Sequence, residues 1–292
     1  MLDMQTMKPM TGSAAPEAIS FPAPGATLQG TLYLPASPPR AAVVLNGATA
    51  VPQGFYRAFA TWLANSEGIA CLTYDYRDFA RSAQAHPKHS TATMADWALR
   101  DQPAARAEMR RRLPGVPLWV IGHSLGGMLM PMQEGIEDID RMIAVASGLV
   151  HHQDHPWPYQ GLARLFWFGH VPALTRLLGY LPGRIAGFGP DLPATAYWQW
   201  REWCTHPHSY FPHLGASLPQ PAWHRSSATA ELIALADDPV CPPVSTAKLV
   251  GVYGVEQSRF RVLDPAEKGL SKVGHLGAFA RANAALWPEI IG

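Results

Sequence analysis

Short runs of almost uninterrupted apolar residues constrain the fold of this chain more than any other feature. Residues 41–45 (AAVVL), 118–121 (LWVI) and 142–146 (MIAVA) carry no polar side chain. Strands of this kind are covered on both faces, as in a parallel sheet flanked by helices. Amphipathic stretches lie between the runs, and this alternation predicts an α/β fold with a mostly parallel central sheet.

Seven strands and several helices follow from the pattern. We expect strands at residues 29–34, 41–45, 70–74, 117–121, 141–146, 230–235 and 258–263. One helix has a face formed by Phe55, Phe59, Trp62 and Leu63, at offsets of four, seven and eight. A second, polar helix is expected over residues 101–112, and it ends before a Pro-Gly pair.

The alternation is interrupted between residues 149 and 227. This segment contains six of the ten tryptophans and many prolines, has no convincing strand, and is helical in pattern at 161–180 and 194–204. It stands between two predicted strands, so we expect an insertion rather than a separate domain. The expected organisation is a core of residues 1–148 and 228–292, with a helical cap at 149–227.

The sequence Gly122-His123-Ser124-Leu125-Gly126 joins a buried strand to a helical pattern. It fits the G-x-S-x-G motif, in which a strained turn exposes the serine hydroxyl and a Cβ at either glycine would collide with the neighbouring chain. The turn also places the Leu125 N–H at a helix N-terminus, where it can stabilise an oxyanion. We therefore predict Ser124 as a nucleophile, and we expect Pro131 to kink the helix that follows.

A serine nucleophile needs a base and an acid that orients it, normally in the chain order Ser, Asp or Glu, His. Asp237 and Asp238 follow the strand at 230–235, and His275 lies in a loop between the last strand and the final helix. We predict Ser124, Asp238 and His275 as the triad, with Asp237 as the alternative acid. His123, beside the serine, is interpreted as a residue that packs or shapes the loop.

Several motifs together resemble the α/β-hydrolase superfamily, and most of all a group of largely uncharacterised bacterial hydrolases near its serine-aminopeptidase-like branch. They are NGATAVPQGFYRAF, YDYR, GHSLGG, DDPVCP and GHLGAF, and the likeness extends from about Leu28 to the C-terminus.

This resemblance carries three expectations about single residues. The superfamily's D-x-[IV]-x-P loop favours Asp238 over Asp237. Asn46-Gly47-Ala48 stands where relatives have His-Gly, which implies that the Ala48 N–H is the second oxyanion donor. In the loop at 75–82, Asp78 and Ala80 occupy positions where glycine is usual, and the loop's role in relatives is structural.

The inserted segment leaves the sheet at the edge where Ser124 is expected, so it should cover that residue. Its aromatic side chains would then line an apolar pocket, and we name Trp200 and Trp203 as substrate-binding candidates. The alternative is that a small cap needs bulky residues for its own core.

Composition limits the partners. A net charge of +1 argues against electrostatic binding to nucleic acid or anionic membrane, and no apolar run is long enough to span a bilayer. Three scattered cysteines and the absence of a signal-peptide pattern in residues 1–20 lead us to expect a cytoplasmic protein.

Two clusters contain metal-ligating residue types, but their spacing matches no metal site, and we predict no metal or other cofactor. They are His151, His152, Asp154 and His155, and Cys204, His206 and His208.

These observations predict a serine hydrolase that cleaves a carboxylic ester, or a related acyl bond, in an apolar or aromatic small-molecule substrate. The same triad would serve an acyltransferase, a thioesterase or an amidase. A non-catalytic binding protein that retains the fold is a further alternative, although a binder has no need for a complete triad. The sequence carries no signal for the oligomeric state.

Overall fold

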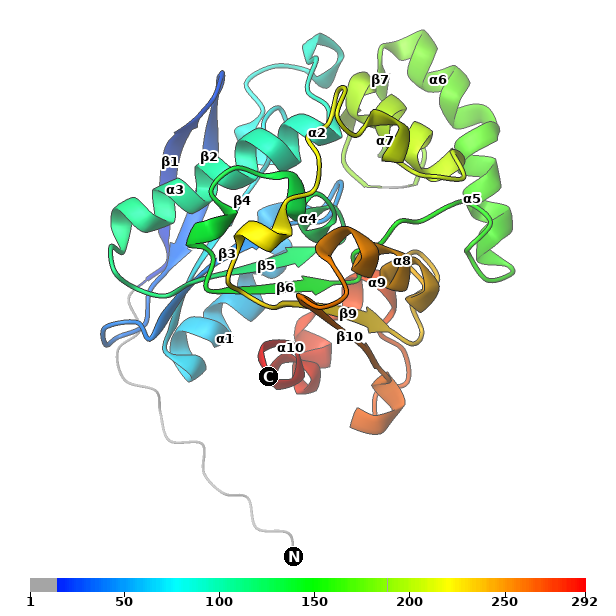
Figure 1. Ribbon diagram of the computed structural model, residues 1–292. Coiled ribbons are helices and arrows are strands. Elements are labelled where there is room, and N and C mark those ends of the chain that lie inside the picture. The colour runs from blue at the N-terminus through cyan, green and yellow to red at the C-terminus, as the bar shows by residue number, and fades with distance from the viewer. Residues whose placement is uncertain (1–14, 188) are drawn as a thin grey trace, which may run out of the picture.

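An eight-stranded sheet forms the centre of the computed structural model, which describes residues 15–187 and 189–292 (Figure 1). Its strand order is β1-β2-β4-β3-β5-β6-β9-β10. The strands are β1 (Glu17–Ala23), β2 (Ala26–Tyr33), β3 (Ala41–Asn46), β4 (Ile69–Tyr74), β5 (Leu118–His123), β6 (Arg141–Val145), β9 (Ala230–Leu235) and β10 (Ser258–Leu263). The strands from β4 to β10 in this order are parallel, whereas β2 is antiparallel to both β1 and β4. The predicted mostly parallel sheet is confirmed.

All seven predicted strands are present in this sheet, and β1 is its eighth strand. Its buried residues Ile19 and Phe21 alternate with exposed neighbours, which is the pattern of a strand covered on one face. Pro22 lies within the run and argues against a central strand from sequence alone. The edge position of β1 accommodates the proline, because one side of an edge strand makes no ladder hydrogen bonds.

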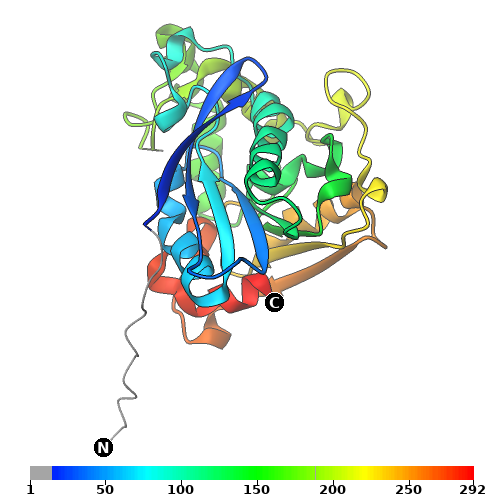
Figure 2. The same ribbon diagram turned by 90° about the vertical axis from the view of Figure 1, so that its left-hand side faces the viewer.

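Helices cover both faces of the sheet (Figure 2). On β3, Val44 packs into one hydrophobic core, and Val43 and Leu45 pack into the other. The first core includes residues from α3 (Gln102–Arg112) and α8 (Pro243–Tyr253), and the second includes residues from α1 (Arg57–Glu67) and α10 (Trp287–Ile291). This two-sided burial explains why the strand runs lack polar residues.

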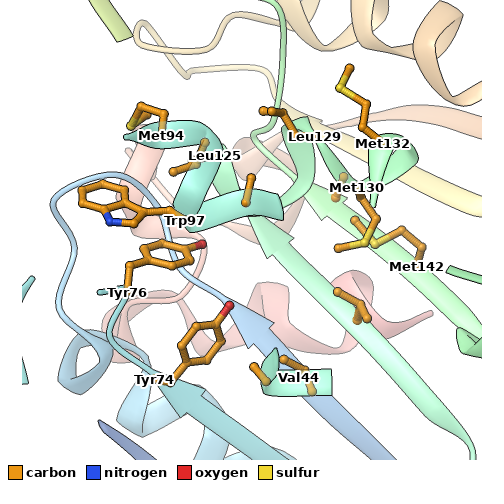
Figure 3. Packing of buried hydrophobic residues seen from close by; sticks show 14 of the residues in the cluster. Val44, Tyr74, Tyr76, Met94, Trp97, Leu125, Leu129, Met130, Met132 and Met142 are labelled. Atoms are coloured by element: carbon orange, nitrogen blue, oxygen red, sulfur yellow. The ribbon is translucent and has the colours of Figure 1, made fainter. Parts of the chain in front are cut away.

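The first core reaches the point where β5 meets the next helix. Tyr76 stacks on Trp97 with ring centroids 5.3 Å apart, and Leu125 lies in the same packed layer (Figure 3). The helix that begins there, α4 (Leu125–Met128), is only four residues long. A 3-10 turn over Met130–Met132 follows it and contains Pro131, so the chain leaves the α-helix before the proline rather than kinking at it.

Residues 149–227, which we call the inserted segment because they connect the neighbouring strands β6 and β9, contain α5 (Tyr159–Phe168), α6 (His170–Leu178) and α7 (Ala194–Thr205). The expected helix over 161–180 is thus two helices with a break at Gly169, where a Cβ would lie 2.4 Å from the Leu165 carbonyl oxygen. The segment also contains two two-residue strands, β7 (Tyr180–Leu181) and β8 (Leu192–Pro193), which the sequence did not indicate because such short pairs carry no periodicity.

Within the described part of the chain, no helix combines the length and the apolar character needed to cross a bilayer. The prediction about a signal peptide concerns residues 1–20, of which residues 1–14 lie outside the described residues.

Candidate active site

Ser124 occupies a strained turn between β5 and α4. Its backbone has φ 54° and ψ −114°, a conformation that L-residues rarely adopt. The flanking glycines allow the turn: a Cβ on Gly122 would lie 2.4 Å from the Gly126 backbone, and one on Gly126 would lie 2.1 Å from the Asn46 carbonyl oxygen. The turn leaves Ser124 partly exposed at the carboxyl end of the strand.

Asn46, at the end of β3, is fully buried and hydrogen-bonds toward this turn. Its Nδ2 donates to the Gly126 carbonyl at 3.4 Å and to Gln102 Oε1 at 3.1 Å, while its Oδ1 accepts from the Tyr74 hydroxyl at 2.7 Å. Asn46 stands where the resemblance predicted histidine. Its amide bonds to the serine turn through the side chain, a contribution that the sequence did not indicate.

His275 and Asp238 form a hydrogen-bonded pair. The distance from His275 Nδ1 to Asp238 Oδ2 is 2.7 Å, and the other carboxylate oxygen accepts from the N–H groups of Val240 and Cys241 at 2.7 and 3.0 Å. Burial alone would raise the pKa of Asp238, but His275 and these two donors outweigh it, and the pKa lies below its usual value. The carboxylate therefore accepts from His275 Nδ1–H, which leaves Nε2 as the basic nitrogen of the ring.

Asp237 makes a different set of contacts. Its carboxylate accepts from the N–H of Val273 at 2.6 Å and from the N–H of Gly274 at 3.0 Å. It therefore fixes the turn that leads to His275 without touching the imidazole. His275 lies in the short helix α9 (Gly274–Gly277), not in a loop ahead of the final helix as the sequence predicted.

His123 links the turn that holds Ser124 to the turn that holds His275. Its Nε2 lies 3.0 Å from the His275 carbonyl oxygen and its Nδ1 lies 2.8 Å from the Tyr56 hydroxyl. Because a carbonyl only accepts, Nε2 carries the proton, and Nδ1 accepts from Tyr56. Complete burial and the neighbouring His275 lower the pKa of His123 to about 3, so this ring is neutral near pH 7.

The Tyr56 hydroxyl oxygen in turn accepts the Ala48 N–H at 2.8 Å. Ala48, the residue named by resemblance as an oxyanion donor, is therefore engaged with Tyr56 and does not line the cavity beside Ser124. Thr49, the next residue, does line it. Leu125 is the first residue of α4, where a backbone N–H has no acceptor within the helix.

A cavity of about 640 Å³ is lined by several of the predicted residues but not by Asp238 or Ala48. Ser124, Leu125 and His275 lie in its lining, while most of the remaining wall is apolar and comes largely from the inserted segment. Trp200 and Trp203 both line it. Trp203 is 1% exposed and packs edge-on against Tyr210, so it also belongs to the internal core of the segment.

The first of the two clusters with metal-ligating residue types, at residues 151–155, makes other contacts. Asp154 accepts from Lys248 Nζ at 2.7 Å and from the His151 N–H, and the His155 Nδ1 donates to the Pro239 carbonyl. Across the described residues, no three His, Cys, Asp or Glu side chains are arranged to hold a metal ion.

The loop at 75–82 has a structural network of its own. Arg77 forms a buried ion pair with Asp101 at 2.6 Å, and Asp75 accepts from the Gln53 N–H at 2.8 Å. Asp78 and Ala80, which replace the usual glycines, have φ values of 56° and 46°. The backbone therefore keeps the conformation that glycine would allow, with side chains that strain it.

Comparisons with known proteins agree with this architecture. The family model described as "Alpha/beta hydrolase family" matches residues 42–286. No match to a curated protein sequence was found.

Similar solved structures include a soluble variant of monoglyceride lipase from Saccharomyces cerevisiae, with 13% identity, 97% of each chain covered and a TM-score of 0.61. A thermophilic esterase from Thermogutta terrifontis has 16% identity, with 95% of this chain and 98% of that chain covered and a TM-score of 0.57. The serine hydrolase XC6422 from Xanthomonas campestris, described as lacking a lid, has 12% identity, coverage of 97% and 96%, and a TM-score of 0.55. At these identities the likeness shows the fold alone. The extent of the family match shows that this chain belongs to the alpha/beta hydrolase family.

Proposed function

We propose that this protein is a serine hydrolase that cleaves a carboxylic ester through an acyl-enzyme intermediate. The observation that carries the proposal is that Ser124, on its strained turn, and His275, paired with Asp238, line the same largely apolar cavity. An activated serine beside an apolar space of this volume suits an acyl group.

In the proposed mechanism, Ser124 Oγ attacks the ester carbonyl carbon while His275 Nε2 accepts the hydroxyl proton. Asp238 holds the ring through Nδ1 and stabilises the imidazolium that forms. His275 then gives this proton to the leaving oxygen as the C–O bond breaks, and the alcohol departs. Water attacks the acyl-enzyme with His275 again accepting a proton, and the carboxylic acid leaves as Ser124 regains its hydrogen.

The carbonyl oxygen becomes negatively charged when Ser124 attacks, and this charge needs hydrogen-bond donors to stabilise it. We assign the first to the Leu125 N–H and the second to the turn formed by Ala48 and Thr49. To act as this donor, the Ala48 N–H gives up its hydrogen bond to the Tyr56 hydroxyl and donates to the substrate oxygen instead. No metal or organic cofactor takes part in these steps.

The inserted segment is proposed to act as a cap that shapes the acyl site, because α5, α6 and α7 all contribute to the cavity wall. Initial rates on p-nitrophenyl esters of increasing acyl length test this function. We expect hydrolysis that depends on chain length and is abolished in Ser124→Ala. Equal activity in Ser124→Ala would contradict the proposal, and product partitioning toward added alcohols would identify an acyltransferase instead.

A further inference from the structure

Exposed apolar side chains are concentrated on the inserted segment. Over the described residues, seven of the thirteen large apolar side chains that are exposed lie between positions 157 and 185. We call these seven the outer apolar surface: Trp157, Leu162, Leu165, Phe168, Leu177, Leu178 and Ile185. Large exposed apolar patches are uncommon on monomeric proteins and often mark a surface that contacts a partner or a lipid phase.

The outer apolar surface lies on α5 and α6, on Trp157 just before α5 and on Ile185 after β7, and these two helices stand at the margin of the molecule (Figure 1). Leu162, Leu165 and Phe168 are spaced by three residues and therefore share one side of α5. Leu162 and Leu165 also line the cavity that contains Ser124. The exposed surface is thus continuous with the wall of the candidate active site.

The charged side chains within residues 155–190 are all basic. The nearest acidic residues in the chain are Asp154, which is paired with Lys248, and Asp191, which accepts from the Arg184 N–H. Residues 155–190 contain Arg164, Arg176 and Arg184 and no aspartate or glutamate, although the whole chain has 22 acidic residues against 23 basic ones. All three arginines are exposed. The net charge of +1, from which the sequence alone argued against anionic membranes, therefore conceals a local segregation of charge.

The combination of apolar side chains and cations indicates the chemistry of the partner. A protein partner needs shape complementarity, but a bilayer surface needs only apolar groups that enter the acyl boundary and cations near the headgroups. Trp157 is 80% exposed, and tryptophan favours the membrane–water interface. Each arginine near an anionic surface strengthens binding about fivefold.

We propose that the outer apolar surface docks on an anionic lipid bilayer, with α5 and α6 lying at the interface and the cavity wall facing the acyl chains. The protein does not span the bilayer in this arrangement. The docking itself does not depend on ester hydrolysis, although delivery of acyl substrates to Ser124 would rest on the proposed function.

Flotation with lipid vesicles, using no substrate, tests the docking. Ser124→Ala prevents any turnover of lipid and should bind as the wild type does. We expect the protein to float with vesicles of phosphatidylcholine and phosphatidylglycerol, to bind phosphatidylcholine vesicles more weakly, and to lose the difference at high salt. Arg164→Gln with Arg184→Gln should remove most of the preference for anionic lipid.

A triple variant, Trp157→Ser, Leu177→Ser and Ile185→Ser, changes exposed residues that do not line the cavity. It should bind vesicles at least about tenfold more weakly and keep its rate on a soluble ester. The matched control, Val244→Ser, Val255→Ser and Phe260→Ser, changes exposed apolar residues outside the inserted segment and should bind as the wild type does. Thermal melts verify that both variants fold.

Three results would overturn the docking. They are absence of wild-type binding to the anionic vesicles, equal binding by the two triple variants, and light scattering that shows a wild-type dimer which the first triple variant converts to a monomer. The last result would identify the surface as a contact between copies of this chain. Inactivity toward all esters combined with normal flotation would instead contradict the proposed function and leave the docking supported.

Discussion

The His123 Nε2–H donates to the His275 backbone carbonyl across 3.0 Å, although the two residues are 152 positions apart in the chain. The residue before the candidate nucleophile therefore holds the turn that presents the candidate base. Tyr56 completes this arrangement, because its hydroxyl donates to His123 Nδ1 and accepts the Ala48 N–H. One buried tyrosine thus connects the chain segments of Ala48, Ser124 and His275.

Tyr56→Phe should lower kcat roughly tenfold to a hundredfold, because small displacements of reacting groups are costly. It should also destabilise the protein by about 1–3 kcal/mol, since His123 Nδ1 and the Ala48 N–H lose a buried partner. Steady-state kinetics and denaturant unfolding measure both. Tyr210→Phe, which removes a buried hydroxyl bonded to the Met128 carbonyl, is the matched control and should lower stability while sparing kcat. Equal kcat values for the two variants would show that Tyr56 has only a structural role.

Asp238→Asn and Asp237→Asn separate the two adjacent carboxylates. Asp238→Asn should lower kcat about a thousandfold or more, because the amide cannot hold His275 in the required tautomer. Asp237→Asn removes charge from the acceptor of two backbone N–H groups, so it should lower stability with a much smaller effect on kcat. Both variants are compared by their kcat on one ester and by their unfolding curves. A larger loss of kcat in Asp237→Asn than in Asp238→Asn would make Asp237 the acid of the triad.

The strained loop at 75–82 offers a prediction about stability. Ala80 has φ 46°, a conformation that costs a residue with a Cβ about 1 kcal/mol. Ala80→Gly should therefore raise the melting temperature. Ala83→Gly, at φ −73° and directly after this loop, gains no such relief and should lower the melting temperature, because glycine adds entropy to the unfolded chain. A lower melting temperature for Ala80→Gly would mean that the entropy which glycine adds to the unfolded chain outweighs the strain that it relieves.

Trp200 and Trp203 test whether the proposed cap sets specificity. Trp200 is only partly buried and lines the cavity, so Trp200→Ala should shift the preference toward bulkier acyl groups. Trp203→Ala should cost about 3–5 kcal/mol of stability, because its side chain is fully buried. Ratios of kcat/KM across the ester panel give the answer for Trp200. An equal loss on every ester would assign this residue to packing alone.

The sheet could be predicted because strands buried on both faces leave an unambiguous apolar pattern. Chain order and the carboxyl-end rule for parallel strands predicted Ser124, Asp238 and His275 at one edge of the sheet. In the structure Ser124 and His275 line one cavity, and His275 is hydrogen-bonded to Asp238. The face of α1 was predicted less well. Its buried residues are Phe59, Ala60, Leu63 and Ala64, and Tyr56 precedes them at the same spacing, whereas Phe55 and Trp62 are only partly buried.

Tyr56 itself could not be identified from sequence, because its role depends on hydrogen bonds to residues 8 and 67 positions away. The outer apolar surface could not be predicted from the sequence for a related reason. Composition averages charge over the whole chain and does not show which apolar residues of a segment remain exposed after folding.

The most direct test of the central claim is the intact mass after exposure to a fluorophosphonate probe, for the wild type and for Ser124→Ala. The account predicts one covalent adduct on the wild type and none on the variant, because the probe reacts only with an activated serine. No adduct on the wild type, or an adduct that persists in Ser124→Ala, would contradict the assignment of Ser124 as the nucleophile.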